Sequence, residues 1–236
     1  MPYGKLYLIP TGLGSGALEI TLPQTVEILI STKFYIVENI RTARRFISSL
    51  KANINIDSLQ FFELNKHTNP NDISSFIKPA FAGEDVGLLS EAGLPGVADP
   101  GAKVVSLAHQ NNINVIPLPG ASSLFLALMA SGLNGQQFAF NGYLPVKSNE
   151  RMQKIRFFEN RSRAENQSQI FIETPYRNNA LLKDFVSACN SKTHLCIAAD
   201  LTMETEFINT KTIGEWKNKL PDLHKRPAVF IIQLIN

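Results

Sequence analysis

Residues 86–101, VGLLSEAGLPGVADPG, join a short apolar run to a turn that is rich in glycine and proline. The run 86–89 is typical of a strand that is buried on both faces of a sheet. The turn after it combines rigid prolines with glycines, whose backbone lets a ligand approach closely. Because open α/β sheets bind ligands at the carboxyl ends of their strands, this segment predicts a parallel sheet with a ligand site at its edge.

Similar apolar runs alternate with helical patterns on both sides of this segment. We expect the other strands of the sheet at 6–9, 34–37, 59–62 and 115–116, with helices that include 102–110. The apolar positions Ile73, Phe76, Ile77, Ala80 and Phe81 predict a further helix, with Asn71 or Asp72 as its N-cap. Strand–helix alternation of this kind predicts an α/β fold whose doubly wound parallel sheet is covered on both faces.

The pattern changes after residues 117–120, PLPG. A helix is expected over 122–130 and another over 179–189, with strands near 138–140, 170–172, 195–198, 206–208 and 229–232. Some of these strands follow one another without a helix between them, which predicts a mixed sheet. We therefore predict an N-terminal α/β domain, residues 1–118, and a C-terminal α/β domain, residues 119–236.

The composition limits the class of protein. The chain has 236 residues, is 44% hydrophobic and contains no apolar run near the roughly 20 residues of a membrane span. The first residues run directly into an expected strand, so we expect no signal peptide, no membrane contact and a cytoplasmic protein. The two cysteines, Cys189 and Cys196, lack the spacing of metal ligands, and we expect reduced thiols and no metal site.

The loop after the first strand resembles a dinucleotide-binding turn. Residues 12–17, GLGSGA, fit a relaxed GxGxxA pattern, and Glu38 ends the second strand about 20 residues later, as that fold requires. However, Pro23 would lie two turns into the helix that such a loop opens, where proline is unfavourable. We expect the helix to begin at Leu22 or Pro23 instead. An NAD-dependent oxidoreductase and a binding module without catalytic activity remain alternatives.

Seven segments carry a resemblance to a known family. The segments LYLIPTGLGSG, VENIR, LLSEAGLPGVADPG, VIPLPGASS, NGYLP, FIETPYR and ADLTMETEF occur in this order between residues 5 and 234. Together they resemble the tetrapyrrole methylase superfamily and, within it, the branch that methylates a cytidine ribose 2′-hydroxyl of bacterial small-subunit ribosomal RNA. The resemblance implies a homodimeric class III methyltransferase that binds S-adenosyl-L-methionine in a cleft between its two domains.

The resemblance also implies the residues that contact the cofactor. In the first part of the chain and at its junction these are Pro10, Ala92, Gly93, Leu94, Val97, Ser122 and Ser123. In the second domain they are Glu173, Leu201, Pro227 and Ala228. Packing in the core is an alternative role for Val97, Leu201 and Ala228, and capping of the next helix is an alternative role for Ser122.

Some segments depart from the pattern of the rRNA branch. The chain has PTGLGSG in place of PTPIGN, ENIR in place of EDTR, and SEAG in place of SDAG. Near the C-terminus, the residues Arg226, Pro227 and Ala228 are more similar to the branch that methylates pyrroles. Ribosomal RNA and a tetrapyrrole or other small molecule therefore both remain open as substrates.

The transfer of a methyl group to a hydroxyl requires alignment and benefits from a general base. The candidates for the base are Glu38 and Glu91, and Arg41 is a candidate for holding a phosphate beside them. A local ion pair between Glu38 and Arg41 is the alternative. No histidine lies in a recognisable motif.

Positive charge is concentrated in the second domain. Residues 147–163 hold six Lys or Arg and two Glu, a net +4, while the whole chain carries +3. We expect this basic segment, with Arg151, Lys154 and Arg156 at its centre, to bind phosphates of RNA. A solvated helix face is the alternative.

Overall fold

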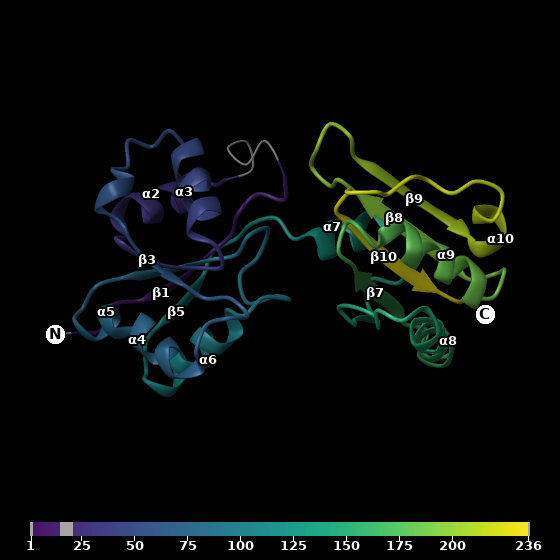
Figure 1. The fold of residues 1–236 in the computed structure, drawn as a ribbon, viewed down its shortest axis with the longest axis horizontal. Helices are drawn as coiled ribbons and strands as arrows, with labels where there is room; N and C mark the ends of the chain where they lie inside the picture. The colour runs from purple at the N-terminus through teal and green to yellow at the C-terminus, as the bar shows by residue number, and fades with distance from the viewer. Residues whose placement is uncertain (1, 15–20, 236) are drawn as a thin grey trace. The chain divides into compact units, whose positions relative to one another are not determined.

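The computed structural model describes residues 2–14 and 21–235 of the chain. The chain divides into two compact units, Met1–Ser122 and Ser123–Asn236 (Figure 1). The division expected from the sequence differs from this one at residues 119–122, which lie with the first unit. Each unit is built around its own sheet.

The first unit contains a five-stranded sheet in the order β3-β2-β4-β1-β5. All neighbouring strands in it are parallel, which confirms the predicted sheet. Its strands are β1 (Leu6–Ile9), β2 (Phe34–Val37), β3 (Gln60–Glu63), β4 (Val86–Leu89) and β5 (Val115–Pro117). In register, Val37 lies beside Leu89 and Ile9 beside Leu89. The residues that follow β1, β2 and β4 therefore come together at one edge of the sheet.

Helices cover both faces of this sheet (Figure 1). On one face, Leu29, Ala43 and Ile47 pack against alternate strand residues such as Ile9. On the other face, Ile73, Val104 and Ala108 pack against the strand residues that alternate with those of the first face. The helices are α2 (Pro23–Ser31), α3 (Ile40–Ser49), α4 (Ile73–Phe76), α5 (Lys78–Phe81) and α6 (Ala102–Gln110), with short 3₁₀ turns η1 (Ile56–Ser58) and η2 (Pro70–Asp72).

Two local features of these helices follow from proline. Helix α2 begins at Pro23, as expected, because proline lacks an N–H and suits the first turn. The apolar stripe over 73–81, by contrast, forms two short helices that meet at Ile77, because Pro79 cannot donate to a continuous helix. Asp72 occupies the N-cap position of α4 but its side chain does not cap the helix, and Asn69 caps the preceding turn η2 instead.

The second unit contains a mixed five-stranded sheet in the order β6-β7-β10-β8-β9, as predicted. Strands β6 and β7 are parallel, and the other neighbours are antiparallel. The strands are β6 (Phe138–Phe140), β7 (Ser168–Ile172), β8 (His194–Ala199), β9 (Phe207–Thr212) and β10 (Ala228–Gln233). Because β10 runs against β7 and β8, its first residue lies beside the last residues of those two strands.

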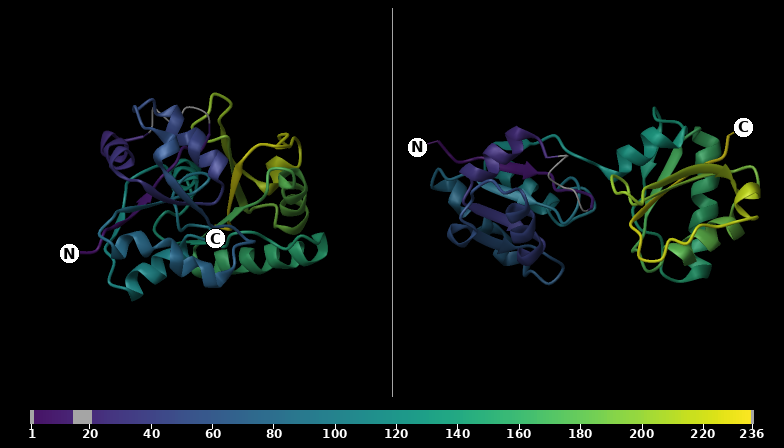
Figure 2. Two further views of the ribbon diagram at one scale, coloured as in Figure 1. Left: turned by 60° about the vertical axis from the view of Figure 1, so that its left-hand side comes forward. Right: turned by 90° about the horizontal axis from the view of Figure 1, so that it is seen from above.

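Four helices complete the second unit, namely α7 (Ser123–Ser131), α8 (Ser148–Glu165), α9 (Asn178–Ala188) and α10 (Ile213–Trp216) (Figure 2). Ile155, Phe185 and Trp216, from α8, α9 and α10, share one apolar core with residues such as Phe230 of β10. The indole N–H of Trp216 donates to the carbonyl of Leu195, 2.9 Å away, which satisfies this buried donor. Helix α7 contacts β8, β9 and β10 outside that core.

None of the helices in the described part of the chain combines the length and the apolar character that a membrane crossing demands.

Candidate functional site

The loops after β1 and β4 are hydrogen-bonded to each other. Thr11 and Gly93 form a two-way backbone bridge, with N–O distances of 3.0 and 3.3 Å. The hydroxyl of Ser90 donates to the carbonyl of Gly93 at 2.9 Å, and the hydroxyl of Thr11 donates to the carbonyl of Ser90 at 3.3 Å. Four hydrogen bonds therefore fix these two loops at the carboxyl edge of the sheet.

Two glycines allow a close approach of backbone at this edge. Gly93 has a φ of +75°, and a Cβ there would lie 3.3 Å from the carbonyl oxygen of Ala121. A Cβ on Gly120 would lie 2.3 Å from the Cβ of Pro10, so no larger residue fits without movement of the chain. The loops after β1, β4 and β5 thus meet at Pro10, Gly93 and Gly120 because two of these residues have no side chain.

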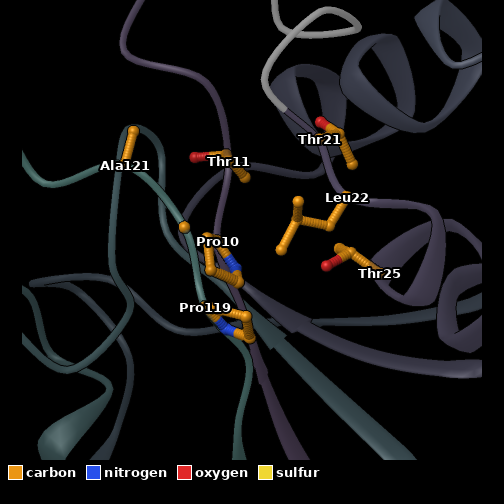
Figure 3. A pocket seen from close by; sticks show the side chains of 8 residues that line it. Pro10, Thr11, Thr21, Leu22, Thr25, Pro119 and Ala121 are labelled. Atoms are coloured by element: carbon orange, nitrogen blue, oxygen red, sulfur yellow. The ribbon is translucent and has the colours of Figure 1, made fainter.

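A small pocket opens beside this junction (Figure 3). Its empty volume is about 240 Å³, part of it open to solvent, and it is lined by Pro10, Thr11, Thr21, Leu22, Thr25, Pro119, Gly120 and Ala121. Thr25, whose side chain carries a hydroxyl, is 3% exposed. Figure 3 shows this hydroxyl directed into the pocket, where it can bind a polar ligand atom.

Three carboxyl groups gather at the ends of β2 and β4. The carboxylate of Glu38 accepts a hydrogen bond from the backbone N–H of Glu91 at 3.3 Å. Burial raises the pKa of Glu38 above its ordinary value, the hydrogen bond from Glu91 opposes this, and the charges of Asp99 and Glu91 add to the rise. A carboxylate whose pKa is raised is a stronger base than an ordinary one.

Asp99, which no sequence pattern singled out, shapes the loop after β4. Its carboxylate accepts hydrogen bonds from the backbone N–H groups of Gly96, at 2.9 Å, and Gly101, at 2.8 Å. Burial raises the pKa of Asp99, although both hydrogen bonds lower it. The Asp-Pro-Gly sequence could have indicated this residue, because aspartate before such a turn often binds nearby backbone N–H groups.

The structure separates the roles of Glu38 and Arg41. Arg41 is exposed in the first turn of α3, and none of the ion pairs within the described residues joins it to Glu38. The side chain of Asn39, rather than that of Glu38, caps α3 by accepting from the N–H of Thr42 at 3.1 Å. The carboxylate of Glu38 is therefore used neither by a cap nor by a local ion pair.

The other predicted cofactor residues of this part of the chain differ in exposure. Ala92 is exposed, Leu94 is half-buried, and Val97 is 44% exposed, so Val97 is not a core residue in this unit. Ser122 ends the first unit, and Ser123 is the first residue of α7 in the second. Both serines are half-buried.

In the second unit, Glu173 lies at the carboxyl end of β7 in an ion pair. Its Oε1 accepts from the guanidinium of Arg177, with an N–O distance of 2.5 Å, and from the N–H of Thr174 at 2.7 Å. Its other oxygen, Oε2, is buried and has no hydrogen-bond partner within the described residues. A buried carboxylate oxygen without a partner is costly, and a donor group of a ligand would satisfy it.

The strand order places the other predicted residues of this unit beside Glu173. Ala228 starts β10 opposite Ala199, the last residue of β8, and Leu201 follows shortly after. Leu201 is 6% exposed and Ala228 is 8% exposed, so both also contribute to packing, while Pro227 is exposed.

A second ion pair, absent from the sequence analysis, lies at the same edge of this sheet. Arg226 donates to Asp200 at 2.7 Å and to the carbonyl of Thr205 at 2.6 Å. Asn178 donates to the carbonyl of Arg226 at 2.6 Å, and its own side-chain oxygen is buried without a partner in the described residues. The two carboxylates, Glu173 and Asp200, are thus both neutralised by arginine at the strand ends.

The expectation that Arg151 binds phosphate is wrong. Arg151 is 4% exposed, and its guanidinium contacts Asp184 of α9, with an N–O distance of 2.5 Å, and the carbonyls of Pro145 and Val146. The side chain therefore links α8 to α9, and its guanidinium is not available to bind a phosphate. Lys154 and Arg156 remain exposed on α8.

Other charges of the basic segment are also partly neutralised. Lys147 pairs with Glu150, 3.3 Å away, and Arg161 pairs with Glu165, 3.1 Å away. The first pair is already counted in the net charge of the segment, whereas Glu165 lies just beyond it and lowers the net charge of residues 147–165 to +3.

No cluster of potential metal ligands occurs within residues 2–14 and 21–235. The dinucleotide-like glycine turn falls in part on residues 15–20, which lie outside the described part of the chain. The helix that was expected to begin at Leu22 or Pro23 does begin at Pro23.

Comparison with protein families gives one match along most of the chain. The profile of the Tetrapyrrole (Corrin/Porphyrin) Methylases matches residues 5–217. Similar proteins include three named Ribosomal RNA small subunit methyltransferase I. The one from Vibrio cholerae is 31% identical over 89% of this chain and 69% of its own length. The one from Helicobacter pylori strain 26695 is 32% identical over 84% and 71%, and the one from Escherichia coli O157:H7 is 28% identical over 98% and 78%.

Solved structures share the fold at lower sequence identity. The methyltransferase CobJ superimposes with a TM-score of 0.64 at 16% identity, over 98% of this chain and 94% of its own. The uroporphyrin-III C-methyl transferase of Thermus thermophilus, solved in complex with S-adenyl homocysteine, gives a TM-score of 0.58 at 17% identity, over 98% and 97%.

Proposed function

Since the chain belongs to the tetrapyrrole methylase family and is an S-adenosylmethionine-dependent methyltransferase, we propose that its substrate is the ribosomal RNA of the small subunit. The observation that carries this proposal is the similarity to rRNA methyltransferases along nearly the whole chain, up to 98% of it. The site of methylation that we propose is a ribose 2′-hydroxyl. A ribosomal substrate implies an enzyme that works in the cytoplasm.

We propose contacts with the cofactor in each unit. In the first unit we propose contacts from Pro10, Ala92, Gly93, Leu94 and Val97, and at the junction from Ser122 and Ser123. The four hydrogen bonds that hold the loops after β1 and β4 support this, since a rigid edge reduces the entropy lost on binding.

In the second unit we propose contacts from Glu173, Leu201, Pro227 and Ala228. The buried Oε2 of Glu173, which has no partner within the described residues, supports this assignment. An acceptor of this kind suits an amino or hydroxyl group, and the adenosine part of the cofactor carries both.

The reaction places specific demands on Glu38. The cofactor supplies a methyl group on a positively charged sulfur, and the ribose oxygen displaces that sulfur in line. As the oxygen–carbon bond forms and the carbon–sulfur bond breaks, the hydroxyl must lose its proton. We propose that Glu38 accepts this proton, because its raised pKa and its position at the sheet edge suit a general base. Glu91 holds Glu38 through its backbone N–H, and Arg41 can bind an adjacent phosphate.

The second candidate substrate, a small acidic pyrrole, loses one argument in the structure. A small acidic pyrrole would need basic side chains, and Arg226 lies in the segment 226–228 that is more similar to the pyrrole-methylating branch. The side chain of Arg226 is instead engaged by Asp200 and by the carbonyl of Thr205. Its charge is therefore already neutralised by the protein.

Transfer of label decides between the two substrates. The protein is incubated with radiolabelled S-adenosylmethionine and, in parallel, with small-subunit rRNA, assembling small subunits and a uroporphyrinogen. We expect label in the RNA, at a nucleotide whose 3′ phosphodiester resists alkaline cleavage, because a methylated 2′ oxygen cannot attack it. Label in the pyrrole and none in any RNA would refute the proposal.

Binding measurements test the cofactor and the assembly. We expect S-adenosylmethionine, and not NAD, to raise the thermal stability, since a ligand at 100 times its Kd contributes about 2.7 kcal/mol. A shift with NAD alone would contradict the assignment. We also propose a homodimer, as the family resemblance implies, and light scattering of the purified protein would show a monomer if this is wrong.

A further inference from the structure

Tyr176 is the most exposed aromatic side chain in the described part of the chain, at 72%. It lies in the loop between β7 and α9, three positions after Glu173. Glu173 lies at the carboxyl end of β7, where we propose that the cofactor binds. Single exposed aromatic residues are common on protein surfaces, so exposure alone indicates little. The surroundings of Tyr176 distinguish it.

The loop that carries Tyr176 is held in place on both sides. The N–H of Arg177 donates to the carbonyl of Thr174 at 2.8 Å, and the guanidinium of Arg177 binds the buried Glu173. On the other side, the N–H of Lys225 donates to the carbonyl of Pro175 at 3.1 Å. The ring is therefore presented by a fixed backbone, and a partner that binds it does not pay for ordering the loop.

A second ring lies beside it. The centroids of Tyr176 and His224 are 6.1 Å apart at an interplanar angle of 73°. His224 is exposed and follows Asp222, which accepts hydrogen bonds from the N–H of His224 at 3.0 Å and from the side chain of Asn179 at 2.7 Å. The two rings thus form an exposed aromatic corner with an anchored backbone.

The charges around this corner cancel. Arg177 is paired with Glu173, and Arg226 is paired with Asp200. Exposed Lys225 is offset by exposed Asp222, whose pKa is lowered chiefly by its hydrogen bond from Asn179. A surface of this kind is not suited to gripping phosphates, but its rings can stack on a planar group.

We infer that Tyr176, with His224 beside it, is a stacking platform for an unpaired base of the RNA substrate. The inference rests on the proposed function, and it assigns one of the places where the RNA contacts the protein. Stacking on an aromatic side chain contributes about 1–3 kcal/mol per base and tolerates every base. Unpaired bases of structured RNA are the parts that proteins bind in this way.

The experiment compares Tyr176→Ala with Tyr176→Phe, and uses Tyr3→Ala as a matched control. Tyr3 is 51% exposed and also contacts one ring, that of Phe81, but it precedes β1 at the opposite edge of its sheet. Affinity for a short fluorescent single-stranded RNA is measured by anisotropy at several salt concentrations. S-adenosylmethionine affinity is measured by calorimetry on the same preparations.

We expect Tyr176→Ala to weaken RNA binding about 5- to 150-fold, the equivalent of one lost stacked base. Tyr176→Phe keeps the ring and should bind within about 2-fold of the parent, as should Tyr3→Ala. The salt dependence of binding should be the same for all four proteins, since no phosphate contact is lost. Irradiation with RNA that contains 5-iodouracil should cross-link to the peptide that contains Tyr176.

Three results overturn the inference. The first is equal RNA affinity of Tyr176→Ala and the parent, which would leave the rRNA proposal intact. The second is an equal loss in Tyr176→Ala and Tyr176→Phe, which would assign the role to the hydroxyl. The third is a parent that binds no RNA but binds a tetrapyrrole, in which case the proposed function fails as well.

Discussion

The burial of Arg151 leads to a prediction about stability. Replacement by glutamine removes the guanidinium from Asp184 and from the carbonyls of Pro145 and Val146. The side chains of the ion pair are only 5% and 14% exposed. Water can therefore replace little of what is lost.

Breaking a buried ion pair by removing one partner costs about 3–5 kcal/mol. We expect a value near the lower end, about 3 kcal/mol, because Asp184 keeps its hydrogen bond from the hydroxyl of Ser148 at 3.0 Å. With a urea m-value of about 1–3 kcal/mol/M, the unfolding midpoint falls by about 1–3 M. Arg156→Gln changes an exposed residue of the same helix and should stay within about 0.5 kcal/mol of the parent.

The assay uses the fluorescence of Trp216, the single tryptophan of the chain, which is buried in the core of the second unit. Its emission therefore reports the unfolding of the unit that contains Arg151. Asp184→Asn and the double variant Arg151→Gln/Asp184→Asn complete a double-mutant cycle, and the coupling energy isolates the pair. If Arg151→Gln unfolds at the same urea concentration as Arg156→Gln, the pair does not fasten α8 to α9 and our reasoning is refuted.

Three further predictions concern the site. Gly93→Val should weaken S-adenosylmethionine binding at least about 10-fold in calorimetry with an unchanged far-UV circular dichroism spectrum, since a branched residue at a φ of +75° is strained by about 1–3 kcal/mol; normal affinity would mean that the loop after β4 is misassigned. Glu38→Gln should lower kcat/KM about 10²- to 10⁴-fold and remove an acid limb that lies above the ordinary glutamate pKa, because burial raises the pKa of Glu38. A raised carboxyl pKa also means that the parent becomes more stable as pH falls from the pKa of Glu38 in the folded protein to the ordinary pKa of glutamate. Urea titrations at several pH values should show that the glutamine variant lacks this gain. An unchanged pH–rate profile of the variant would exclude Glu38 as the base. Lys154→Gln/Arg156→Gln should make the logarithmic salt slope of single-stranded RNA binding shallower by about 1.4, or 0.7 for each phosphate contact, without changing cofactor affinity; an unchanged slope would identify α8 as a solvated face.

Most of the fold could be predicted because its signals are local. The strands β1, β2 and β4 are continuous apolar runs, and each begins and ends where the sequence pattern does. Strand β9 was predicted only as far as residue 208, although it extends to Thr212. Its last residues are polar and half-buried at the edge of the sheet, so no apolar pattern marks them.

The site was predictable where strand order alone decides proximity. Glu38 and Glu91 follow neighbouring parallel strands, so their proximity follows from the fold. The fate of Arg151 was not predictable, because its partner Asp184 lies 33 positions away on another helix. A basic run in a sequence does not show which of its members the tertiary structure buries.

The order of strands in the first sheet has a consequence for synthesis on the ribosome. Strand β1 is made first but lies inside the sheet, where Leu6 pairs with Val86 on one side and with Val115 on the other. Neither neighbour exists until much of the first unit has been translated. A nascent chain that stops short of residue 115 therefore leaves one edge of this apolar strand open. An unpaired strand edge can form hydrogen bonds with other chains. We therefore expect this unit to need rapid completion of synthesis, or a chaperone, more than a protein in which each strand pairs with the next one in sequence.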